Sequence, residues 1–129
     1  MIAANELRIG NWVNIKVEGK NGTFDGNYQI EEIRKDVILF NNGIHAAYRM
    51  LYPIPLTGER LLKCGFEDRI LDIGISDLWL GYNSIFEVNI FIDDIAKGYV
   101  ELSNNPRISL HQLQNLFFEL TGKELEVKL

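Results

Sequence analysis

Residues 109–122 read SLHQLQNLFFELTG, and this stretch decides the fold class. Its apolar residues recur at the spacing of one helix face: Leu110, Leu113, Leu116, Phe117 and Leu120. Ser109 followed three positions later by Gln112 is a capping-box signature, and Gly122 is a suitable helix terminator. The pattern predicts one amphipathic helix over 109–121 that packs its Leu and Phe stripe on a sheet.

The segment before this helix predicts an antiparallel meander. Four runs rich in β-branched and aromatic residues are separated by turn residues: Phe66–Ile73, Leu78–Tyr82, Ile85–Ile92 and Tyr99–Ser103. The third run alternates polar residues with an apolar row made of Phe86, Val88, Ile90 and Ile92. Leu78, Leu80 and Tyr82 stay on the same buried face if the connection has three residues, because a one-residue slip inverts every side chain.

The N-terminal half predicts further short strands, at 12–17, 28–33, 36–40 and 44–48, with a glycine-rich hairpin tip over 18–27. Pro53 and Pro55 favour an extended connector. A short helix over 58–64 follows, capped by Thr57, with Leu61 and Leu62 facing inward. Residues 123–129 alternate charged and apolar side chains, which favours a terminal strand over an ordered tail.

Together these elements predict an α+β domain spanning residues 1–129. Ile9–Val13, followed by Tyr28–Ile30 and Val37–Phe40, is similar to the opening of small SH3-like barrels. The expected fold is therefore an SH3-like β-rich N-terminal part over 1–52, and then a part over 57–129 in which the C-terminal helix covers the meander. Barrels of this kind bind protein, RNA and DNA alike, so the fold does not select a partner.

Composition and charge exclude several classes of protein. The chain has 129 residues, of which 47% are hydrophobic and 24% charged, and this balance argues against disorder. The net charge of −5 divides into +1 for residues 1–65 and −6 for residues 66–129. We therefore expect any nucleic-acid contact in the first half.

The lone cysteine and the opening residues indicate a location. A single cysteine, Cys64, excludes an intramolecular disulfide. The opening MIAANELRIG lacks the features of a signal peptide and reads as a mature N-terminus, and no apolar run is long enough for a membrane helix. A cytoplasmic protein without a membrane partner is expected.

Residues that carry chemistry are few and scattered. His45 and His111 lack metal-ligand spacing, so no metal or cofactor is expected, and His111 is predicted to face solvent. Cys64 is predicted to be a buried structural residue, and we expect no enzyme activity. The alternative is a small hydrolase that uses Asp72, Asp77 or Cys64 with a histidine.

Aromatic residues offer the strongest potential for interaction. In the predicted meander Trp79, Phe91 and Tyr99 share the face opposite the buried row, and Trp12 is a further candidate. This face is either covered by a second layer or exposed as a surface for a partner or a second copy. A second layer is favoured, because the N-terminal strands must pack somewhere.

A second function remains open, namely nucleic-acid binding by the N-terminal half. Its phosphate contacts and stacking rings are predicted to be Lys16, Lys20, Arg34 and Lys35 beside Trp12, Phe24 and Tyr28.

Three parts of the chain carry a family resemblance. Asn5–Val13, the middle segments Pro53–Thr57 and Leu61–Glu67, and the closing segments His111–Leu116 and Leu120–Gly122 resemble short uncharacterised proteins encoded by phages, prophages and mobile elements of gut bacteria. The shared residues are turns, caps and core positions. No activity or catalytic residue is carried over from this resemblance. Together with the absence of an assembled catalytic set, the resemblance favours an accessory protein that works through protein contacts or self-association.

Overall fold

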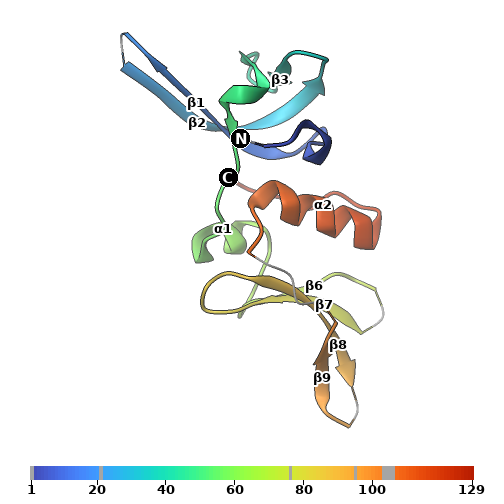
Figure 1. Ribbon diagram of the computed structural model, residues 1–129. Coiled ribbons are helices and arrows are strands. Elements are labelled where there is room, and N and C mark those ends of the chain that lie inside the picture. Colours follow the sequence, from blue (N-terminus) through green and yellow to red (C-terminus); the bar gives the residue numbers. More distant parts are fainter. Residues whose placement is uncertain (1, 21, 76, 95, 103–106) are drawn as a thin grey trace. The chain divides into compact units, whose positions relative to one another are not determined.

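The computed structural model describes residues 2–20, 22–75, 77–94, 96–102 and 107–129, and it has the expected α+β class. The chain divides into two units (Figure 1). Unit 1 comprises Met1–Pro55 and Ser109–Asn115, and unit 2 comprises Leu56–Ile108 and Leu116–Leu129. The first boundary falls at the end of the proline connector, and the last falls inside the C-terminal helix.

Unit 1 is built on a five-stranded antiparallel sheet. Its strands are β1 (Trp12–Gly19), β2 (Gly22–Ile33), β3 (Ile38–Phe40), β4 (His45–Ala46) and β5 (Leu51–Tyr52), in the order β4-β3-β2-β1-β5. Two 3-10 turns, η1 (Ala4–Glu6) and η2 (Tyr48–Met50), flank the sheet elements. The alternation of β1 is the predicted one, because Val13 and Ile15 are buried in a core that includes Ile30, Ile38, Phe40 and Leu51.

Two predictions in unit 1 are wrong. The expected hairpin tip over 18–27 is mostly strand, because β1 pairs with β2 from Trp12↔Gln29 to Gly19↔Gly22. The side-chain amide of Asn14 stabilises this ribbon by donating to Asp25 and Asn27. Figure 1 shows the two-stranded hairpin of β1 and β2 extending beyond the rest of the sheet. The expected strand over 44–48 shortens to β4, because the chain then turns into η2.

Unit 2 contains the meander, a curled four-stranded antiparallel sheet in the order β6-β7-β8-β9. The strands are β6 (Ile70–Asp72), β7 (Leu78–Tyr82), β8 (Val88–Asp94) and β9 (Gly98–Glu101), and the short helix α1 (Gly58–Lys63) precedes them. Leu78, Leu80 and Tyr82 pair with Ile92, Ile90 and Val88. The predicted sharing of one face is therefore confirmed, although the connection has five residues rather than three. Both lengths are odd, so the side-chain parity is unchanged.

Strand boundaries in unit 2 differ from the predictions where the backbone turns. Residues 66–69 form a turn with positive φ at Asp68 (50°) and Arg69 (67°), so the expected strand 66–73 is reduced to β6. Phe86 also has a positive φ of 62°, which delays β8 to Val88. Ser103, the expected end of the last strand, lies outside the described residues. Residues 123–129 are an ordered tail rather than a strand, and Lys128 N–H donates to Lys63 O.

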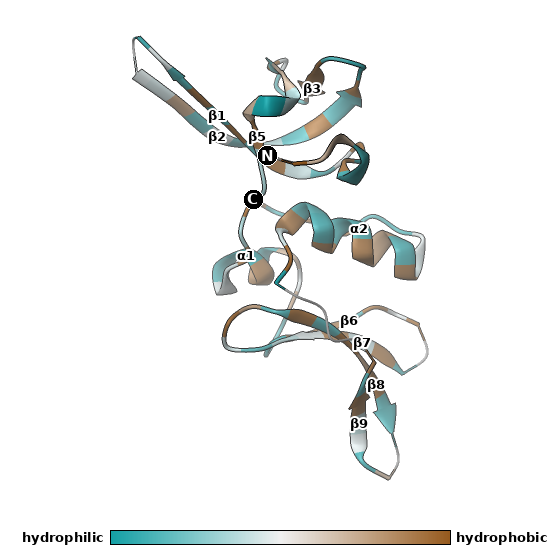
Figure 2. Cartoon of the chain, viewed as in Figure 1, coloured by the Kyte–Doolittle hydropathy of each residue, from teal (hydrophilic) through white to brown (hydrophobic). Residues whose placement is uncertain are grey.

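Both predicted helices form, but part of their predicted packing is wrong. Thr57 Oγ1 accepts from Arg60 N–H at 3.2 Å and caps α1; Leu61 is buried, whereas Leu62 is 64% exposed. Helix α2 (Leu110–Thr121) has the amphipathic alternation visible in Figure 2. Its buried residues Leu110 and Leu113 belong to unit 1 rather than to the meander unit. Polar side chains on this part of α2 bond to the N-terminal segment, a contact that periodicity does not reveal.

Candidate functional site

Three aromatic rings lie together on one face of the unit 2 sheet, and we call Trp79, Phe91 and Tyr99 the aromatic face. Trp79 and Phe91 are a cross-strand pair whose rings stack with centroids 4.4 Å apart. Tyr99 meets each of them edge-on at 5.6 Å. The predicted shared face is thus present, since residues that alternate along adjacent strands point to the same side.

Each ring of the aromatic face has an acidic residue opposite it on the neighbouring strand. Asp72 pairs with Trp79, Glu101 pairs with Phe91, and Asp93 pairs with Tyr99. The indole Nε1–H of Trp79 also donates to Asp93 Oδ1 at 3.0 Å, which holds the indole in place. In the row that crosses all four strands, the stacked rings of Trp79 and Phe91 are therefore flanked by Asp72 on one side and Glu101 on the other.

Gly81 leaves room for the stacked rings. A Cβ built at Gly81 would lie 2.8 Å from the Trp79 ring and 3.0 Å from the Phe91 ring. Real Cβ atoms do not approach so closely, and the φ of Gly81 is not in the left-handed region. The glycine is needed here because the rings lean over it.

Two hollows open on this side of the sheet. One, of about 290 Å³, is lined by the rings of Trp79, Phe91 and Tyr99 together with Arg69, Glu87 and Glu101. The other, of about 320 Å³, is lined by Trp79 and Ile70 with the three acids Asp72, Asp77 and Asp93. Trp79 and Ile70 line both hollows, so the two lie next to each other.

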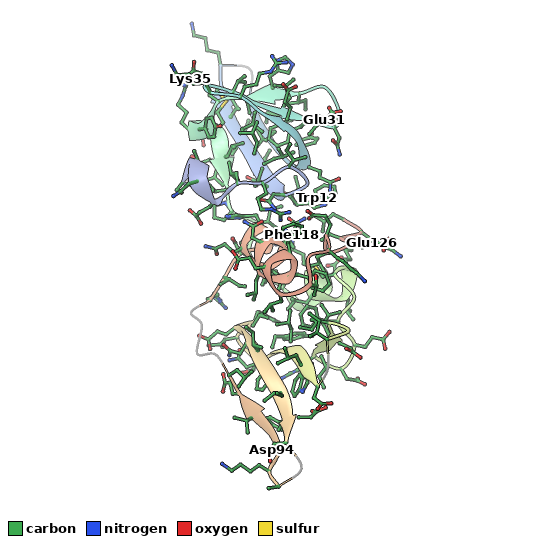
Figure 3. All side chains as sticks on the ribbon, turned by 90° about the vertical axis from the view of Figure 1, so that its right-hand side faces the viewer. Trp12, Glu31, Lys35, Asp94, Phe118 and Glu126 are labelled. Atoms are coloured by element: carbon green, nitrogen blue, oxygen red, sulfur yellow. The ribbon has the colours of Figure 1, made fainter. Side chains whose placement is uncertain are left out.

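The three rings of the aromatic face differ in their exposure. Tyr99 is 56% exposed, whereas Trp79 and Phe91 are each partly buried. The second layer favoured from the sequence stays a prediction. Trp12, the fourth predicted interaction residue, belongs to unit 1 and is labelled in Figure 3.

A larger groove in unit 2, of about 690 Å³, is lined by apolar residues from α1, β6, the end of α2 and the tail, among them Leu62, Leu71, Phe117 and Leu125. Four of its charged lining residues lie in pairs: Lys63 is 3.4 Å from Glu59, and Lys128 is 4.0 Å from Glu126. Asp72 and Glu124 also line the groove.

The predicted nucleic-acid contacts do not form one patch. Lys16 lies 3.9 Å from Asp25, and Arg34 forms a two-pronged contact with Glu32, at 2.9 Å and 3.3 Å. Lys20 and Lys35 flank opposite ends of β2, whose 12 residues span about 40 Å along the strand. Of the predicted stacking rings, Phe24 lies on Tyr28 with centroids 5.9 Å apart.

The predicted hydrolase residues are divided between the units. Both histidines belong to unit 1, whereas Cys64, Asp72 and Asp77 belong to unit 2. Cys64 is buried as predicted, and burial raises the pKa of its thiol to about 11, which disfavours the reactive thiolate. In the part of the chain that the structure describes, no three His, Cys, Asp or Glu side chains are placed to hold a metal ion.

A polar network in unit 1 was not predicted from the sequence. Gln114 is buried; its Oε1 accepts from Trp12 N–H at 2.8 Å, and its Nε2 donates to Gly10 O at 3.0 Å. Asn115 Nδ2 donates to Glu6 O at 2.7 Å. These partners are more than 100 positions apart in the chain, so no local pattern indicates them.

His111, predicted to face solvent, is 2% exposed and belongs to this network. Ser109 Oγ donates to Gln112 Oε1, so it must accept from His111 Nδ1–H, at 2.9 Å. In this tautomer Nε2 of the neutral ring carries no proton. It has no hydrogen-bond partner among the described residues, and it lies 3.6 Å from Glu6 Oε1. The bonds of Gln112 to Ser109 N–H and to Glu6 fix the orientation of its amide.

The buried imidazole makes the stability of unit 1 depend on pH. Burial lowers the pKa of His111 below its usual 6.5, although Glu6 partly opposes the shift. The unfolded chain therefore takes up a proton at higher pH than the folded chain. The stabilisation is complete above about pH 6.5 and is lost as the pH falls through the folded pKa.

We expect the free energy of unfolding of unit 1, followed by Trp12 fluorescence in urea in a Trp79→Phe background, to be lower at about pH 5.5 than at about pH 7.5. His111→Gln should flatten this dependence, and His45→Gln, at an exposed position, should leave it unchanged. An NMR titration of the wild-type chain reads the His111 pKa directly. A midpoint above 6.5 would contradict the prediction.

Comparisons with known proteins add no relative. No family model matches the sequence, and no curated protein or solved structure matches it either. None of the helices in the described ranges is long and apolar enough to cross a membrane.

Proposed function

We propose that the chain is a non-enzymatic accessory protein that binds a protein partner through the aromatic face. In this proposal it is a cytoplasmic protein of the phage and mobile-element kind that its sequence resembles. Unit 1, with its five short antiparallel strands, serves as an SH3-like scaffold.

The observation that carries the proposal is the three-ring cluster on an open sheet face. Trp and Tyr are enriched among the residues that contribute most to protein interfaces. A core-forming sheet has no need of a stacked Trp and Phe pair on its second side. The cluster also includes Tyr99 on β9, an edge strand of this sheet, whose backbone groups can pair with an added strand.

The charge of unit 2 favours a different protein over a second copy as the partner. Unit 2 has seven Lys and Arg against twelve Asp and Glu, so it carries the whole net charge of −5. Two such faces brought together would oppose like charges, which is unfavourable.

Site-directed photo-crosslinking in the native host tests the proposal. A photoreactive residue at position 70, an exposed site that lines both hollows, should capture a protein distinct from this chain. The same residue at position 123, an exposed site after α2, should not capture it. Tyr99→Ser should abolish the capture at position 70, because it removes the most exposed ring without opening the core.

The proposal fails if position 70 captures nothing, or if the two positions capture the same species. A crosslink between two copies of this chain contradicts a distinct partner. Self-association through the aromatic face would make the purified protein a dimer and Tyr99→Ser a monomer. Light scattering measures the mass of both.

A further inference from the structure

We infer that the aromatic face recognises arginine side chains on a basic, extended segment of the partner. This inference rests on the proposed function, since it names the chemistry of the partner that the same surface takes. The ligand group is a guanidinium because aromatic ring planes and carboxylates lie side by side on this face.

The cross-strand register supplies both halves of a guanidinium site. A guanidinium stacks on an aromatic plane and donates in a fork to a carboxylate. On this face Phe91 lies opposite Glu101, and Tyr99 lies opposite Asp93. Trp79, the ring type most favourable for cation contacts, lies opposite Asp72.

The same contact already occurs within the chain beside the rings. The guanidinium carbon of Arg69 lies 5.9 Å from the centre of the Tyr82 ring, and both residues line the hollow that holds the aromatic face. The neighbouring hollow contains Trp79 and three acids, and none of the described residues that line it is a Lys or Arg. The charged side chains that an incoming cation meets there are therefore negative.

The hollows have the size of side-chain sites. Their volumes of about 290 Å³ and about 320 Å³ are at the lower end for small ligands and suit one long side chain each. Because the hollows share Trp79 and Ile70, two arginines of one extended segment can occupy them together. The net charge of unit 2 attracts such a segment from a distance.

Peptide binding followed by the fluorescence of Trp79 tests the inference. The Trp12→Phe variant leaves Trp79 as the sole tryptophan, at the centre of the surface. The probes are three otherwise identical peptides with arginine, citrulline or glutamate at every second position. Citrulline keeps the shape of arginine and removes its charge, so it separates charge from packing.

We expect the arginine peptide to change the fluorescence at saturation. The affinity of the citrulline peptide should be lower by at least about tenfold. Raising the salt from about 50 mM to about 500 mM should weaken the binding of the arginine peptide. Glu101→Gln should weaken it about threefold or more, because it removes one carboxylate and keeps the shape. Glu119→Gln, an exposed change on α2, is the matched control and should have no effect.

Equal binding of the arginine and citrulline peptides would overturn the inference. So would preferential binding of the glutamate peptide or of a single-stranded oligonucleotide, since both are anionic. The result is distinguishable from failure of the proposed function. If position 70 captures a protein while the arginine peptide does not bind, the interaction surface stands and its arginine specificity is wrong.

Discussion

Leu61→Ala is expected to lower the free energy of unfolding of unit 2 by about 2–5 kcal/mol, whereas Leu62→Ala next to it should change it by less than about 0.5 kcal/mol. Leu61 is 0% exposed and Leu62 is 64% exposed. Both lie within the six residues of α1, so alanine brings the same gain in helix propensity at either position. The difference between the variants therefore measures core packing alone.

Urea unfolding of the Trp12→Phe background measures this difference. Trp79 then reports on unit 2, because it lies on the sheet of that unit. If both leucine variants lose the same stability, the inward orientation of only one leucine is wrong. If neither loses stability, α1 does not unfold together with the sheet.

Local patterns in the sequence predict the elements well where the backbone stays regular. The alternation of β1, the extent of β7 and the start and end of α2 were all readable from residue spacing. The errors lie where a few residues adopt positive φ, as at Asp68, Arg69 and Phe86. Non-glycine residues rarely adopt this conformation, so no residue type at these positions announces a turn.

Long-range contacts explain the other errors. His111 looked solvent-facing because the polar side of an amphipathic helix usually is. The segment that buries it includes Glu6, more than 100 positions earlier, and the contact is polar. Hydrophobic periodicity detects only apolar faces, so it misses a helix face that docks through amide side chains.

The candidate site was half predictable. Alternation places Trp79 and Phe91 on one face, and the parity of the connection is sufficient for this. The pairing of each ring with an acid requires the exact register across all four strands, which needs the structure. The need for Gly81 under the rings also follows only from coordinates, because a glycine in a strand has several explanations.

The net charge of the chain is distributed unevenly between the two units. The acidity calculated for residues 66–129 is a property of unit 2, and unit 1 has six Lys and Arg against six Asp and Glu. In the proposed function, the neutral unit 1 is the scaffold and the acidic unit 2 carries the binding surface. A cationic partner therefore has one electrostatically favoured unit to approach.

Gln114→Ala is expected to lower the free energy of unfolding of unit 1 by about 2–5 kcal/mol. The substitution leaves Trp12 N–H without its acceptor and opens a cavity at a position that is 1% exposed. Gly10 O is affected less, because it also accepts from Gln29 Nε2. The lost bond is part-buried, and Gln114 itself is 1% exposed, so the substitution leaves the donor poorly solvated.

Gln114→Met separates the two contributions, because methionine fills the space of glutamine without accepting from Trp12. It should cost about 1–3 kcal/mol, the range for one buried unsatisfied group. Glu119→Ala, at an exposed position of the same helix, is the control and should stay within about 0.5 kcal/mol. Trp12 fluorescence in a Trp79→Phe background follows unit 1.

If Gln114→Met leaves the free energy of unfolding unchanged, the helix is held by apolar packing and the amide bonds to residues 10 and 12 are incidental. If methionine accounts for most of the alanine cost, hydrogen bonding fixes this part of α2 on unit 1.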